Sequence, residues 1–163
     1  MPRTELDRLH DDARIWIFGI SPLLDRLQSQ TVLRVVDSFL DQWAAHGTPI
    51  TSARTILDDS FLIVAVDKKS ETSGCSIDKM FGLLRQLERD LDVEILDANR
   101  VFVRDAAGHV RSLTRAEFRE EGDPHTKVFD TTAERLGDIR SGRWERKAAE
   151  SWHAALLPKS TAR

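Results

Sequence analysis

The fold is decided by six residues, Phe61-Leu62-Ile63-Val64-Ala65-Val66, in which every side chain is apolar. A run of this length, rich in β-branched residues and closed by the polar Asp67, is typical of a buried strand. In a sheet with one face in water, polar residues would alternate with apolar ones. Since they do not alternate here, we expect both faces of this strand to be covered.

Apolar patterns on either side of this strand predict a β-α-β-β-α-β order. The turn-forming residues Asp58-Asp59-Ser60 join the central strand to the one before it as a hairpin. Apolar positions at helical spacing mark two amphipathic helices. The expected elements are strands at 14–20, 51–57 and 61–66, short apolar runs at 93–96 and 101–103, and helices at about 23–45 and 77–91.

This order is that of the ferredoxin-like, split-βαβ plan, in which a four-stranded antiparallel sheet carries both helices on one face. The sequence therefore predicts an α+β fold of this class. We expect a C-terminal α/β extension to cover the other sheet face, with a partner subunit as the alternative. The predicted organisation is a polar lead-in over 1–13, a βαββαβ core domain over 14–103 and an extension over 104–163 packed on the core.

The extension carries weaker patterns. Thr114 followed by Glu117 is a capping-box signal for a short helix. We expect a hairpin around the turn Asp105–Gly108, the short helix after Thr114, a strand at 126–130 and a helix near the end of Arg143–Leu157 that carries Trp144 and Trp152.

Composition excludes several function classes. A net charge of −3 argues against a general nucleic-acid binder. No apolar run approaches the ~20 residues that span a bilayer, and the charged N-terminal stretch does not look like a signal peptide, so we expect a cytoplasmic protein without a membrane partner. The histidines are scattered and no phosphate-loop motif occurs, so we expect no metal and no cofactor.

The segment Ser73-Gly74-Cys75-Ser76-Ile77-Asp78 precedes the second helix and holds the single cysteine of the chain. One interpretation is helix initiation, in which a serine caps the helix and the acid complements its positive end. The other is a site, because a thiol in the first turn can become acidic and the free amides can hold a phosphate or carboxylate. Both interpretations remain open from the sequence.

The candidate ligand-binding residues are Asp67, Ser73, Gly74, Cys75, Ser76 and Asp78, and Cys75 is the candidate catalytic nucleophile. Asp67 has the alternative role of a loop cap that accepts bonds from local amides. We expect the first and third strands to run parallel. His46 at the end of the first helix would then lie about 30 Å from Cys75 and serve the helix terminus.

The stretches "RIWIF", "WAAHG", "FLIVAVD" and "SGCSID", with a late Ser151-Trp152, resemble a small uncharacterised bacterial family common in Bacteroidetes and relatives. Its members are often labelled "ABC transporter ATPase". The chain has no phosphate loop, so we do not transfer that activity. The resemblance makes Trp43, His46, Asp67, Gly74, Cys75, Ser76 and Asp78 the positions to test.

Three functions follow as hypotheses. The first is a cytoplasmic, non-enzymatic binding or adaptor protein with a pocket for a small anion or a peptide carboxylate at the start of the second helix. The second is a hydrolase or transferase that uses Cys75 as nucleophile. The third is a structural or assembly protein that forms a homodimer.

Overall fold

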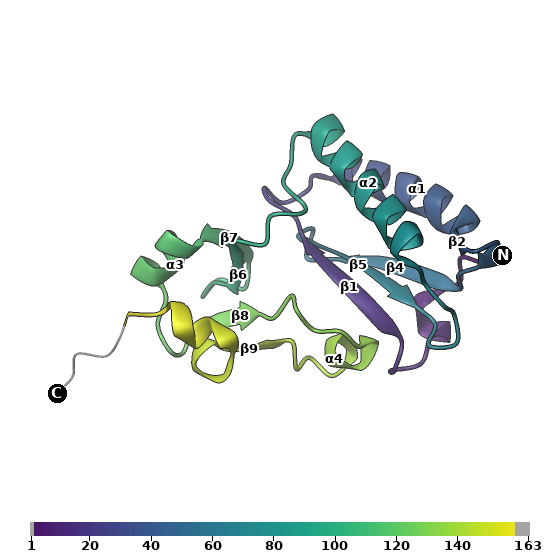
Figure 1. Cartoon of the computed structure of the whole chain (residues 1–163). Helices are drawn as coiled ribbons and strands as arrows, with labels where there is room; N and C mark the ends of the chain where they lie inside the picture. Colours follow the sequence, from purple (N-terminus) through teal and green to yellow (C-terminus); the bar gives the residue numbers. More distant parts are fainter. Residues whose placement is uncertain (1, 159–163) are drawn as a thin grey trace.

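The computed structural model describes residues 2–158, in which helices pack against two antiparallel sheets (Figure 1). A small two-stranded hairpin completes the β-structure. The elements in chain order are η1 (Leu6–Arg8), β1 (Arg14–Gly19), α1 (Arg26–Gln42), β2 (Ala44–Ala45), β3 (Thr48–Pro49), β4 (Ser52–Leu57), β5 (Phe61–Val66), α2 (Gly74–Leu91), β6 (Arg100–Arg104), β7 (Val110–Thr114), α3 (Arg115–Glu121), β8 (Lys127–Phe129), α4 (Leu136–Arg140), β9 (Glu145–Lys147), η2 (Ala148–Glu150) and η3 (Trp152–Leu156).

The first sheet has the strand order β1-β5-β4, and each strand is antiparallel to its neighbour. β4 and β5 form the predicted hairpin, and Asp58 and Asp59 in its turn both have positive φ. Every residue of the central strand β5 is buried. The strand is thus covered on both faces, as its uninterrupted apolar sequence predicts.

Helices α1 and α2 lie together on one face of this sheet (Figure 1). α1 begins where Asp25 forms a capping box with Gln28, and this carboxylate satisfies an amide that the helix cannot pair itself. The apolar positions that recur at helical spacing in the sequence form the buried face of each helix. The residues of these faces are Val32, Val36, Leu40, Met80, Leu84 and Leu87.

The opposite face of the sheet is covered by segments from both ends of the chain. Leu9, which follows η1, and Leu136 of α4 pack with Ile63 of β5 in one buried cluster. Phe61 of β5 packs against Phe129 and Trp144 of the C-terminal part, with ring centroids 4.8 and 4.9 Å apart. Aromatic contacts of this kind join the two sheets into one core.

The second sheet has the order β7-β6-β8-β9. The predicted hairpin between β6 and β7 is present, and Thr114 and Glu117 form the predicted capping box of α3. The helix expected near the end of Arg143–Leu157 is present only as the short 3-10 helix η3, which includes Trp152 but not Trp144. Residues 143–157 form β9 and two short 3-10 helices, and Trp144 is buried by the aromatic contacts just described rather than by a helix face.

The expected four-stranded sheet is also wrong, and the ferredoxin-like arrangement is therefore not confirmed. Only one residue of the run at 93–96, Glu94, pairs with the first sheet, through an isolated bridge to Ser21. The chain then leaves β1, and β6 joins the second sheet instead. Element order alone does not decide which of two sheets a strand joins, and the observed fold is a mixed α+β structure with antiparallel sheets.

The predicted distance of about 30 Å between His46 and the start of the second helix is wrong. It assumed parallel first and third strands, whereas β1 and β5 are antiparallel. α1 therefore ends where α2 begins, and Nε1 of Trp43 donates a hydrogen bond of 2.9 Å to the carbonyl of Ser76. His46 does not cap a helix. With Gly47, also at positive φ, it forms the turn of the β2–β3 hairpin.

Candidate functional site

The predicted site segment forms the start of α2. The Ser73 hydroxyl accepts the Ser76 N–H at 3.1 Å, and the Ser76 hydroxyl accepts the Ser73 N–H at 2.8 Å while donating to the Ser73 carbonyl. This is a complete capping box. Both serine hydroxyls therefore serve the helix itself, which is the helix-initiation interpretation of the sequence.

Most other residues of this segment are open to solvent, and only Ile77 is half-buried. Cys75 and Asp78 are exposed in the first turns of α2. Within residues 2–158 no side chain hydrogen bonds to the Cys75 sulfur. No described atom lies within 4 Å of the place where a Cβ on Gly74 would stand, so no close contact requires a glycine there.

Asp67 lies at the end of β5, and its carboxylate accepts the N–H of Lys69 at 2.8 Å. This is the loop-cap role that the sequence offered as the alternative. Asp67 also lines a recess of about 250 Å³ together with Arg14, Lys68 and Arg135. None of the other predicted ligand-binding residues lines that recess.

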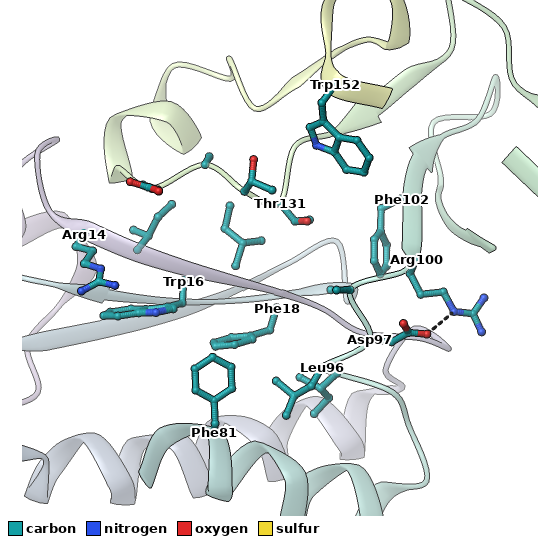
Figure 2. A pocket seen from close by; sticks show the side chains of 18 of the residues that line it. Arg14, Trp16, Phe18, Phe81, Leu96, Asp97, Arg100, Phe102, Thr131 and Trp152 are labelled. Atoms are coloured by element: carbon teal, nitrogen blue, oxygen red, sulfur yellow. Dashed lines mark ion pairs between the residues drawn. The ribbon is translucent and has the colours of Figure 1, made fainter. Parts of the chain in front are cut away.

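A larger cleft of about 940 Å³ lies between β1 and the C-terminal part of the chain (Figure 2). Its residues come from six separated parts of the sequence. Its lining includes five aromatic residues and four arginines. The aromatic lining residues are Trp16, Phe18, Phe81, Phe102 and Trp152, and the charged ones are Arg14, Asp97, Arg100, Arg115, Glu134 and Arg135.

The aromatic side chains come from the two sheets, from α2 and from η3. The rings of Phe18 and Phe81 pack edge to face, with centroids 5.7 Å apart, and form part of the core beneath the cleft. Phe102 packs directly on the backbone of Gly19, where a Cβ would overlap its ring. Trp152 reaches toward the cleft from the C-terminal segment, as Figure 2 shows, and stays 39% exposed.

The arginines give the cleft a positive character. The Arg14 guanidinium lies 4.3 Å from the centroid of the Trp16 ring, and that of Arg115 lies 5.7 Å from the Trp152 ring. In the described part of the chain, neither of them nor Arg135 forms an ion pair. Each guanidinium thus keeps donors that can bind a carboxylate or a phosphate.

Arg100 differs from these three arginines because acidic groups already surround it. Its Nε lies 3.2 Å from Glu94 and 3.9 Å from Asp97, and Figure 2 draws the second pair. Among the residues that the structure describes, the cleft therefore holds one locally neutralised arginine and three arginines free to meet a ligand.

A serine and a histidine also lie in contact near the C-terminal end of the described residues. The Ser151 hydroxyl is 2.7 Å from Nδ1 of His153, and the ring of His153 is buried against Phe118. Burial lowers the pKa of His153 to about 4, against the opposing effect of the Asp130 charge. The imidazole is therefore neutral at pH 7, and its contact with Phe118 joins η3 to α3.

The chain matches no family model, no curated protein and no solved structure. The bacterial family named above thus stays a prediction. Across residues 2–158 no three His, Cys, Asp or Glu side chains gather to hold a metal ion, and none of the helices there is both long and apolar enough to cross a membrane.

Proposed function

We propose that the chain is a non-enzymatic binding or adaptor protein whose ligand is anionic and occupies the cleft beside β1. The observation that carries this proposal is the set of three arginines, Arg14, Arg115 and Arg135, that face an aromatic cleft without ion-pair partners among the described residues. Arginine binds carboxylates and phosphates through paired N–H donors, and it does so best beside apolar surface.

The size and chemistry of the cleft support binding. Its volume of about 940 Å³ falls within the range of about 300–1,000 Å³ that small-molecule and cofactor sites occupy. Arginine does not release its proton near neutral pH, so these side chains hold charge rather than transfer protons. The ligand class is that proposed from the sequence, an anion or a peptide carboxylate, while the cleft replaces the start of α2 as its site.

The first sheet supports a finer description of the fold. We propose that it is a ferredoxin-like sheet without its fourth strand. The order β1-β5-β4 and the two helices on one face agree with that plan. In that plan the fourth strand lies along the edge of β1 that here faces the cleft.

The test uses citrate and pyrophosphate, with sodium chloride at equal ionic strength as the reference. Either anion is expected to raise the melting temperature of the wild type, because binding to the folded state alone stabilises it. Arg14→Gln combined with Arg115→Gln should abolish this shift. Arg85→Gln, on the exposed face of α2 outside the cleft, should keep it. If neither anion shifts the wild type beyond the chloride reference, the proposal is wrong.

A second candidate rests on the exposure of Cys75 in the first turn of α2. A hydrolase or transferase with this nucleophile needs a thiol that reactants can reach. Alkylation by iodoacetamide as a function of pH tests it. A rate that follows an ordinary thiol, with a midpoint near ~8.5, would remove this candidate.

A further inference from the structure

One edge of β1 has backbone groups without partners among the described residues. Among the described strands β1 pairs only with β5, apart from an isolated bridge between Arg14 and Arg135, so every second residue turns its N–H and C=O away from the sheet. The N–H of Ile15, which turns this way, donates to the carbonyl of Glu134 at 3.0 Å. The alternation gives the same outward direction to Ile17 and Gly19, and neither has a hydrogen-bond partner there within residues 2–158.

This open edge is bounded at both ends. The Ile15 bond to Glu134 closes one end, and Ser21 closes the other by exchanging two bonds of 2.9 and 2.8 Å with Glu94. From residue 15 to residue 21 a strand extends about 20 Å. Two residues with outward N–H and C=O groups therefore lie in a slot that a short extended segment can fill.

We propose that an extended acidic peptide binds this slot as an added strand, pairing with the backbone of Ile17 and Gly19. The inference rests on the proposed function and names the ligand class of the same cleft. Strand addition is a general mode of peptide recognition, in which main-chain bonds give affinity and alternate side chains give specificity. The peptide would take the position of the absent fourth strand.

The charges beside the slot favour an acidic peptide. Arg14 and Arg135 stand at the end of β1 where the slot begins, and the bridge between these residues shows their proximity. Arg115 lies against Trp152 on the opposite wall. A bound strand points its side chains alternately to two sides. A sequence of alternating acidic and apolar residues would meet both the arginines and the aromatic rings.

The slot suits a peptide better than other anionic chains. Ile17 and Gly19 each offer a donor and an acceptor, which a peptide backbone matches, whereas a phosphate accepts bonds only and leaves the carbonyls unpaired. A second copy of this chain, pairing β1 with β1, would bring two arginine-lined clefts together. Repulsion between them argues against that occupant.

The test uses a fluorescein-labelled peptide Glu-Val-Glu-Val-Glu-Val, whose binding is followed by anisotropy. Amide hydrogen exchange of the wild type is measured with and without the unlabelled peptide. Strand pairing predicts that exchange at Ile17 and Gly19 slows at least about tenfold on binding, since these amides gain acceptors. The peptide Lys-Val-Lys-Val-Lys-Val should not bind.

Two changes remove the pairing without removing charge. Two peptides are compared, one N-methylated at its odd-numbered residues and the other at its even-numbered residues. Only one of them should lose binding, because only every second amide of the peptide faces β1. Ile17→Pro removes an outward N–H, keeps the bonds of its neighbours to β5, and should weaken the peptide at least about tenfold. The citrate shift of melting temperature should survive Ile17→Pro, which also shows that the variant folds.

The outcomes separate the two proposals. If citrate shifts the melting temperature but the acidic peptide does not bind, strand addition is wrong and the anion site stands. Strand addition is equally wrong if N-methylation has no effect in either peptide, or if decathymidylate binds more tightly than the peptide. Protection of Ile17 and Gly19 by self-association alone would make a second copy the occupant. If neither citrate nor peptide binds, both proposals fail.

Discussion

The indole Nε1 of Trp43 donates a hydrogen bond of 2.9 Å to the backbone carbonyl of Ser76. The donor follows the last residue of α1, and the acceptor lies in the first turn of α2. This buried bond joins the end of one helix to the beginning of the next. It thereby fixes the relative position of the two helices on the sheet.

Trp43→Phe should destabilise the protein by about 1–3 kcal/mol, the combined effect of a lost buried hydrogen bond and a small cavity. Urea unfolding measures the change. Trp152→Phe, at a partly exposed indole outside the core, serves as the control and should cost less than about 0.5 kcal/mol. Equal stability of the two variants would contradict a structural role for the Trp43 bond.

Local patterns predict the local structure. The capping boxes at Ser73 and Thr114 and the hairpin turn at Asp58 depend on residues three or fewer positions apart, so the sequence carries all the information that they need. The uninterrupted apolar run of β5 likewise predicts burial on both faces.

Long-range pairing cannot be predicted in the same way. The residues at 93–96 are apolar enough for a strand, but whether they extend along β1 depends on what else competes for that edge. The sequence pattern places Trp144 on a helix, although its burial comes from Phe61 and Phe129, which are distant in the sequence. Periodicity indicates which face of a helix or strand is apolar, but it does not indicate which other element packs against that face.

The cleft could not be predicted from the sequence either, because it also depends on residues that are distant along the chain. The three arginines of the cleft that form no ion pair within residues 2–158 are at positions 14, 115 and 135, and nothing in their spacing predicts that they lie along one cleft. The one available signal is Arg14 directly before the apolar run "IWIF", where a cation two residues before an aromatic side chain lies on the same face of a strand. The cysteine motif is easier to recognise because its residues are contiguous.

Substitutions at two glycines compare the packing of the cleft, at Gly19, with that of the cysteine motif, at Gly74. Gly19→Ala should destabilise by about 1–3 kcal/mol, because the new methyl group overlaps the Phe102 ring in a packed region. Gly74→Ala has open space in the first turn of α2 and should be neutral or stabilising by up to about 1 kcal/mol. Thermal unfolding compares the two variants. A destabilised Gly74→Ala would show that the motif has a packing role that its surroundings do not indicate.

The thiol of Cys75 should react with a maleimide in the folded protein, since the residue is exposed. Mass spectrometry without denaturant should show one modified site per chain. Cys75→Ser should change the free energy of unfolding by less than about 0.5 kcal/mol, as for other exposed positions. The modified protein should keep the citrate response of the cleft. Loss of that response on modification would return the ligand site to the start of α2.

The carboxylate of Asp37 on α1 accepts two bonds of 2.7 Å from the guanidinium of Arg54 on β4. These bonds hold the pKa of Asp37 below its ordinary value. Their contribution is present above the unfolded pKa of about 3.9 and is lost as the pH falls through the lower folded value. Asp37→Asn should cost about 1–2 kcal/mol at pH 7 and progressively less in acid. Urea unfolding at pH 7 and pH 3 checks this, and a loss that does not shrink in acid would contradict it.

The buried imidazole of His153 should make the protein sensitive to mild acid. Burial lowers its pKa to about 4, whereas an unfolded histidine titrates near 6.5. Between these values the unfolded chain binds a proton that the folded protein does not, so stability falls as the pH drops from about 6.5 to about 4, by at most about 3–4 kcal/mol. Below about 4 both states are protonated and this effect stops.

His153→Asn should lack this part of the pH dependence, while His125→Asn, at an exposed histidine, should keep it. NMR titration of the His153 ring provides the direct measurement, and a midpoint near 6.5 in the folded protein would contradict the argument.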